Sequence, residues 1–81
     1  MTAWRRLLKC NVERLEVWET VDGIVCVKFQ NCEVKGDGVL ISEFGRGLTF
    51  EDACEKYLDA ISGKTLVFNS YSGNRKEVTV L

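Results

Sequence analysis

Residues 48–63 read Leu-Thr-Phe-Glu-Asp-Ala-Cys-Glu-Lys-Tyr-Leu-Asp-Ala-Ile-Ser-Gly, and this stretch predicts the main helix of the 81-residue chain. Counting from Phe50, apolar residues recur at i, i+3, i+4, i+7, i+8 and i+11, which is one continuous face of an α-helix. Thr49 can cap the first turn with its hydroxyl, and Gly63 can end the helix in the left-handed conformation. We therefore expect a helix over about residues 50–62.

A β-hairpin is predicted before this helix. Leu15–Val21 and Ile24–Gln30 alternate in the manner of strands and flank Asp22-Gly23, a dipeptide that favours a two-residue type I′ turn. Such a turn fixes the pairing of the two strands and places Trp18 opposite Val27.

The rest of the chain predicts two more hairpins, and the N-terminal segment fits either a helix or a strand. The expected strand pairs are Cys32–Lys35 with Val39–Phe44, and Thr65–Ser70 with Lys76–Leu81. After Thr2 the apolar residues have helical spacing, but a strand through Leu7–Val12 fits nearly as well. The predicted fold is α+β: one domain over residues 1–81, with a single antiparallel sheet of about five strands and the helix packed on one face.

Both faces of the first hairpin are apolar in this predicted register. One face carries Trp18, Val25, Val27 and Phe29, and the other carries Leu15, Val17, Val21, Ile24 and Cys26. One helix covers only one face of a sheet, and soluble monomers rarely expose large apolar patches. We therefore expect a homodimer or a docked protein partner, and Trp18→Glu or Val17→Glu should alter that association.

The composition excludes several classes of protein. The chain has 11 basic and 12 acidic residues, for a net charge of −1. This balance fits neither a strongly basic nucleic-acid coat nor an acidic DNA mimic. No apolar run approaches the ~18 residues that cross a membrane, and the first ten residues lack the apolar core of a signal peptide. We expect a complete gene product that is cytoplasmic and has no membrane contact.

The cysteines predict neither a metal site nor disulfides. They occupy positions 10, 26, 32 and 54, no Cys-x-x-Cys pair occurs, and the chain has no histidine. Zinc ligands normally come in closely spaced pairs, so we expect reduced, mostly buried thiols with no metal and no cofactor. Without histidine the usual general base is missing, and we expect no catalytic residues and no enzyme activity.

Five residues are candidates for contact with a partner. Trp and Arg are enriched at protein-binding hot spots, and the candidates are Trp4, Arg5, Trp18, Arg46 and Arg75. Arg46 lies in Gly45-Arg46-Gly47, just before the helix. Such a loop can hold an anion with its backbone N–H groups, but an ordinary glycine turn or bulge is the interpretation that we favour.

The segment Gly45–Ala53, Gly-Arg-Gly-Leu-Thr-Phe-Glu-Asp-Ala, preceded by strands, resembles HicB-type antitoxins over roughly Glu16–Phe68. That family has a β-β-β-α-β core and a G-x-T-x-x-E-A signature, which here falls on Gly47, Thr49, Asp52 (in place of Glu) and Ala53. The family's separate DNA-binding segment is missing. The stretch Thr49–Phe68 also looks like small proteins of unknown function from phages of Gram-positive bacteria.

The resemblance implies a non-enzymatic protein-binding inhibitor or accessory factor of phage or mobile-element type. Antitoxins and anti-defence proteins, including anti-CRISPR proteins, block a nuclease or other defence effector by occupying its surface, in the host cytoplasm when phage-encoded. The alternative is a small nucleic-acid-associated module that uses Arg5, Arg6, Lys9, Arg46 and Arg75-Lys76. Salt separates the two, because phosphate contacts weaken steeply as salt rises.

Overall fold

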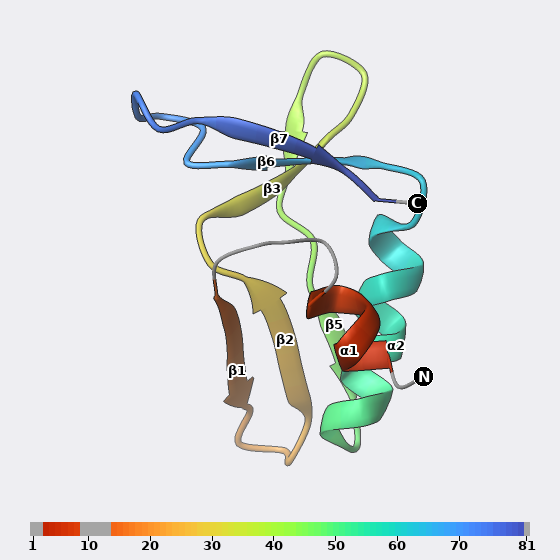
Figure 1. Cartoon of the computed structure of the whole chain (residues 1–81). Helices are drawn as coiled ribbons and strands as arrows, with labels where there is room; N and C mark the ends of the chain where they lie inside the picture. The colour runs from red at the N-terminus through yellow and green to blue at the C-terminus, as the bar shows by residue number, and fades with distance from the viewer. Residues whose placement is uncertain (1–2, 9–13, 81) are drawn as a thin grey trace.

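The chain folds into an α+β structure with two antiparallel sheets and one main helix (Figure 1). The computed structural model describes residues 3–8 and 14–80. The helices and strands of these residues are α1 (Ala3–Leu8), β1 (Leu15–Glu19), β2 (Val25–Phe29), β3 (Cys32–Lys35), β4 (Leu40–Ile41), β5 (Gly45–Gly47), α2 (Phe50–Ile61), β6 (Thr65–Phe68) and β7 (Lys76–Thr79). The predicted α+β class and main helix are confirmed, but the single sheet of about five strands is wrong.

The strands divide between a three-stranded sheet of order β1-β2-β5 and a four-stranded sheet of order β4-β3-β6-β7. In Figure 1 the four-stranded sheet crosses above the three-stranded one, and α2 runs beside β5. Between β2 and β3 the chain turns at Asn31, which has a left-handed φ of 52°. This corner directs the chain out of the first sheet, and residues 42–44 bring it back to β5. Two sheets therefore replace the single predicted one.

Local sequence signals account for α2. The Thr49 side-chain oxygen accepts a hydrogen bond of 3.1 Å from the Asp52 N–H, and Gly63 has a φ of 74°, so both predicted helix ends are confirmed. The buried residues of the helix are Ala53, Cys54, Tyr57, Leu58 and Ile61. Phe50, at the start of the predicted apolar face, is exposed.

The Gly45-Arg46-Gly47 segment is a strand, and the interpretation as a turn or bulge is wrong. It pairs with β2 and lies against α2. A Cβ atom on Gly45 would lie 2.6 Å from the backbone nitrogen of Tyr57, and one on Gly47 would lie 2.6 Å from the Asp52 Cβ. Any side chain larger than hydrogen would push the helix off the sheet. The two glycines are what lets α2 approach β5 so closely.

The first hairpin forms as predicted but in a different register. Trp18 lies opposite Cys26, not Val27. The loop has three residues, because the Thr20 N–H donates to the Ile24 carbonyl at 2.9 Å and Gly23 adopts a φ of 81°. The change by one residue moves Trp18 to the opposite face of β2 from Val27.

The N-terminal segment begins as a helix, and α1 packs on α2 (Figure 1). Its Ala3 and Leu7 side chains are buried in the same core cluster as Val27 and Phe29, and the Ala3 N–H donates to Glu51 Oε1 at 2.7 Å. Most of the alternative strand lies outside the described residues. Both described helices therefore cover the same side of the three-stranded sheet, and neither is long and apolar enough to cross a membrane.

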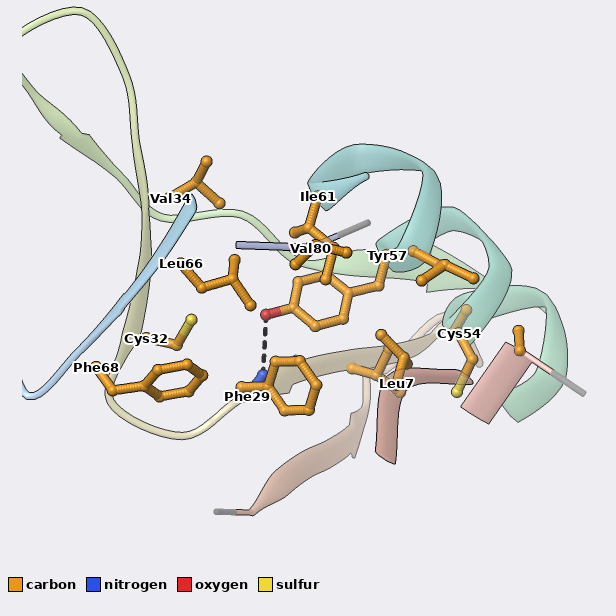
Figure 2. Close-up of a cluster of buried hydrophobic side chains, with 14 residues drawn as sticks. Leu7, Phe29, Cys32, Val34, Cys54, Tyr57, Ile61, Leu66, Phe68 and Val80 are labelled. Carbon is orange, nitrogen blue, oxygen red and sulfur yellow. Dashed lines mark hydrogen bonds between the residues drawn. The ribbon is translucent and has the colours of Figure 1, made fainter. Parts of the chain in front are cut away.

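Tyr57 joins α2 to the point where the two sheets meet (Figure 2). Its hydroxyl accepts a hydrogen bond of 3.1 Å from the buried Phe29 N–H, and the Cys32 thiol of β3 also hydrogen-bonds with the Tyr57 side chain. The Phe29 N–H points to the β5 side of β2, but β5 pairs only with Val25–Val27. The Tyr57 hydroxyl thus satisfies a donor that the sheet leaves unpaired.

Tyr57→Phe should lower the free energy of unfolding by about 1–3 kcal/mol, because the buried Phe29 N–H then has no acceptor. The ring contacts with Phe29, whose centroid lies 5.4 Å away, are retained in this variant. Urea denaturation followed by circular dichroism measures the change. Tyr71→Phe, at an exposed position, is the matched control and should leave stability unchanged. Equal stability of the two variants would contradict the role of this hydroxyl.

Gly45→Ala should lower the free energy of unfolding by about 1–3 kcal/mol or more, because the new methyl group collides with the backbone of α2. Gly73→Ala is the control, since a Cβ there meets nothing within 4 Å, and its effect should stay within about 0.5 kcal/mol. Thermal unfolding of the two variants side by side gives the comparison. A Gly45→Ala protein as stable as the wild type would contradict the close packing of α2 against β5.

Candidate binding face

The side of the three-stranded sheet that points away from α2 brings two of the predicted partner-binding residues together. Gly45 and Gly47 face α2, so Arg46 between them faces away. Arg46 lies opposite Cys26, and Cys26 lies opposite Trp18. Cross-strand partners share one face of a sheet. Trp18, Cys26 and Arg46 therefore form one row across all three strands, on the side that neither described helix covers.

Phe44 extends this row into an aromatic patch. Its ring centroid lies 6.1 Å from that of Trp18, with the ring planes tilted by 41°, and it precedes Arg46 by two residues. Trp18 is 40% exposed and Phe44 is 44% exposed. Cys26 is only 2% exposed although it lies outside the main core cluster, so the neighbouring side chains on this face cover it. We call Trp18, Cys26, Phe44 and Arg46 the binding face.

The charges beside the binding face are mixed, with cations in excess. Lys28 lies opposite Glu16 in the adjacent row of the same face, and the Lys28 Nζ donates to Ser42 Oγ at 3.2 Å. Arg46 is exposed, and none of the described ion pairs involves it. The guanidinium is positioned beside the aromatic pair, where it can meet a carboxylate of a bound molecule.

The outer face of the four-stranded sheet has a different character. Glu77 forms ion pairs with Arg75 at 3.3 Å and with Lys35 at 3.4 Å. The Arg75 guanidinium, followed by Lys35, holds the pKa of the Glu77 carboxyl below its usual range. Arg75, a predicted partner-binding residue, thus has a partner within the chain and lies just before β7, away from the sheet that carries Trp18.

The remaining predicted residues lie on α1. Trp4 and Arg5 are exposed there, and α1 packs against α2 on the side opposite the binding face. The structure therefore brings together Trp18 and Arg46 but not Trp4, Arg5 or Arg75. Phe44 was missed as a candidate. The i, i+2 spacing of Phe44 and Arg46 was the available signal, but it was divided between a predicted strand and a predicted turn.

Two of the described thiols, those of Cys32 and Cys54, are poor nucleophiles because they are buried. Burial raises the pKa of Cys32 to about 11, although a hydrogen bond with Tyr57 and the charge of Lys28 act in the opposite direction. Burial, with a smaller contribution from Glu51, also raises the pKa of Cys54 to about 11. Both thiols are protonated near neutral pH, whereas nucleophiles and metal ligands are thiolates. Cys10 lies outside the described residues.

The described residues contain no group of three or more His, Cys, Asp or Glu side chains that could hold a metal ion. A polar hollow of about 310 Å³ lies between the corner after β2 and the β6–β7 hairpin, lined by Asn31, Glu33, Asn69, Ser70, Tyr71 and Ser72. Its Ser70 hydroxyl donates to Glu33 Oε2 at 2.9 Å. A serine beside a single carboxylate lacks the imidazole base that activates most serine nucleophiles, so this hollow gives no argument for catalysis.

Comparison of the chain with protein-family models, with curated proteins and with solved structures gave no match. The HicB-like core stays a prediction from the sequence.

Proposed function

We propose that the protein is a non-enzymatic, protein-binding factor that occupies the surface of a partner through its binding face. The observation that carries this proposal is the row of Trp18, Cys26 and Arg46, with Phe44 beside it, on a sheet face that no described helix covers. Aromatic residues and arginine dominate the energetics of protein interfaces.

The binding face is suited to recognition because its strands and its aromatic pair are held before a partner arrives. Trp18 and Arg46 extend from paired strands, and Trp18 also packs on Phe44. The backbone and the two aromatic rings therefore lose little conformational freedom on binding. The Trp18–Phe44 pair provides an apolar contact area, and the Arg46 guanidinium can donate two parallel hydrogen bonds to a carboxylate. A partner with an apolar side chain next to an acidic one fits this arrangement.

The specific form of the proposal is an inhibitor or accessory factor of the antitoxin or anti-defence type. Such a protein blocks an effector, for example a bacterial nuclease, by covering part of its surface, and it needs no catalytic group. The resemblance of Gly45–Ala53 to HicB-type antitoxins supports this form, and so does the absence of histidine from the chain.

A small nucleic-acid-associated module is the second candidate. One observation favours it: the aromatic pair lies beside the cations Arg46 and Lys28, and single-stranded nucleic acids bind through stacked aromatics and nearby positive charge. Two observations weigh against it. Arg5 lies on α1, away from this face, and Arg75 is paired with Glu77.

Phe44→Ala and Arg46→Glu should each abolish capture of a specific partner, whereas Tyr71→Ala should not. Tyr71 is the control because it is 94% exposed and lies on the β6–β7 hairpin. Immobilised wild-type and variant proteins are incubated with one bacterial lysate, and the captured proteins are quantified by mass spectrometry. A hot-spot loss of at least about 2 kcal/mol weakens binding about 30-fold, which is enough to remove a partner from the captured set.

The proposal fails if every protein captured by the wild type is captured equally by Phe44→Ala and Arg46→Glu. The second candidate is tested with the same variants on a fluorescent single-stranded oligonucleotide. Oligonucleotide binding that weakens steeply between about 50 and 200 mM salt favours nucleic acid as the partner. If the chain instead binds a captured protein with the same affinity over that salt range, a protein partner is favoured.

A further inference from the structure

Strand β1 is a free edge of the three-stranded sheet. Among the described residues it pairs only with β2, and all its residues except the first are exposed. Natural proteins usually protect such an edge with proline, with charged side chains, lysine above all, or with a bulge. The β1 sequence Leu-Glu-Val-Trp-Glu contains no proline and no lysine, its charged residues are Glu16 and Glu19, and its pairing with β2 is continuous over all five residues.

The hydrogen bonds of the hairpin show which backbone groups of β1 are unpaired. The Gln30 N–H donates to the Arg14 carbonyl, and the Thr20 N–H donates to the Ile24 carbonyl. In an antiparallel pair, hydrogen-bonded positions alternate, so Glu16 and Trp18 also bond to β2. The N–H and C=O groups of Leu15, Val17 and Glu19 therefore point outward, away from the sheet.

The side chains of this edge are incompletely covered on both faces. Val17 lies on the helix side, opposite Val27, yet it is 52% exposed, and Trp18 on the binding face is 40% exposed. One further strand beside β1 would place alternate side chains next to both of them. A single added strand thus accounts for two exposed apolar residues that point in opposite directions.

We propose that the added strand is β1 of a second copy of this chain. The two strands run antiparallel about a two-fold axis at Val17, so that Val17 lies opposite Val17 of the second copy. Leu15 of each copy then lies opposite Glu19 of the other. These are the residues whose backbone groups point outward, and they exchange N–H···O bonds in pairs. The two three-stranded sheets become one continuous sheet.

The charges of β1 favour this register over the one centred on Glu19. With the axis at Val17, Glu16 lies opposite Trp18 of the second copy, and no glutamate faces another glutamate. An axis at Glu19, whose backbone groups also point outward, would place two carboxylates directly opposite each other, which is destabilising. Within each copy, Lys28 lies opposite Glu16 on β2 and offsets its charge. Pairing about the central residue of β1 therefore opposes no like charges.

The size of the contact sets the strength of the dimer. Stable protein interfaces bury at least about 1,200 Å², and a five-residue edge buries less. The dimer is consequently weak and forms reversibly with concentration. Because the two-fold axis is perpendicular to the sheet, the binding faces of both copies lie on the same side, where they can engage a two-fold partner with increased avidity.

Sedimentation equilibrium of the purified chain, from about 10 μM to about 1 mM, tests the proposal without any partner, so its outcome is independent of the proposed function. The average mass of the wild type should rise toward that of a dimer. Val17→Pro removes one outward N–H but no bond to β2, and it should stay monomeric. Val17→Thr keeps the N–H and the branched shape and should behave as the wild type.

A monomeric wild type over the whole range, or a Val17→Pro protein that dimerises like the wild type, would overturn the proposal. Amide hydrogen exchange of the wild type decides the question if Val17→Pro does not fold. The amides of Leu15, Val17 and Glu19 should exchange more slowly at high concentration, while those of Glu16 and Trp18 should be protected throughout. Concentration-independent exchange at Val17 would also overturn the proposal.

Discussion

The hydrogen bond from the Phe29 N–H to the Tyr57 hydroxyl is the contact on which the arrangement of the two sheets depends. Strand β5 ends before it reaches Phe29, so β2 leaves a buried donor without a strand partner. An unsatisfied buried N–H of this kind costs about 1–3 kcal/mol, which exceeds the net contribution of a typical hydrogen bond. Tyr57 supplies the acceptor from α2 and at the same time lies against Cys32, the first residue of β3. One side chain thus holds the helix, the end of one sheet and the start of the other (Figure 2).

The position of α2 in turn decides what the other face of the three-stranded sheet presents. The helix approaches β5 only because Gly45 and Gly47 have no side chains. Because successive side chains of a strand point to opposite faces, Arg46 points away from the helix. The close packing of α2 on β5 and the outward direction of Arg46 are therefore consequences of the same three residues.

The sequence predicted the elements whose signals are local, and missed those that depend on distant contacts. The cap at Thr49, the apolar face and Gly63 all lie within the helix itself, and α2 has almost the predicted bounds. Strand β5 has no apolar periodicity, because two of its three residues are glycines that are needed by a helix further along the chain. The break between the sheets depends on Asn31 in the left-handed conformation, which asparagine tolerates but does not require. For the binding face, Trp18 and Arg46 were predicted one by one, whereas their adjacency follows from the pairing of β1, β2 and β5.

The loop of the first hairpin is the step that unites Trp18 and Arg46 on one face. In the register expected from a two-residue turn, Trp18 would lie opposite Val27, and Val27 lies opposite Gly45, which faces α2. Trp18 would then point to the helix side, on the other face from Arg46. A type I′ turn needs a positive φ at both Asp22 and Gly23, but of these two residues only Gly23 has one. The resulting three-residue loop shifts β1 by one position and reverses the direction of every side chain on it relative to β2. The same shift places Val17 on the helix side and directs its backbone groups outward. The backbone conformation of Asp22 therefore contributes to both the composition of the binding face and the pairing properties of the free edge.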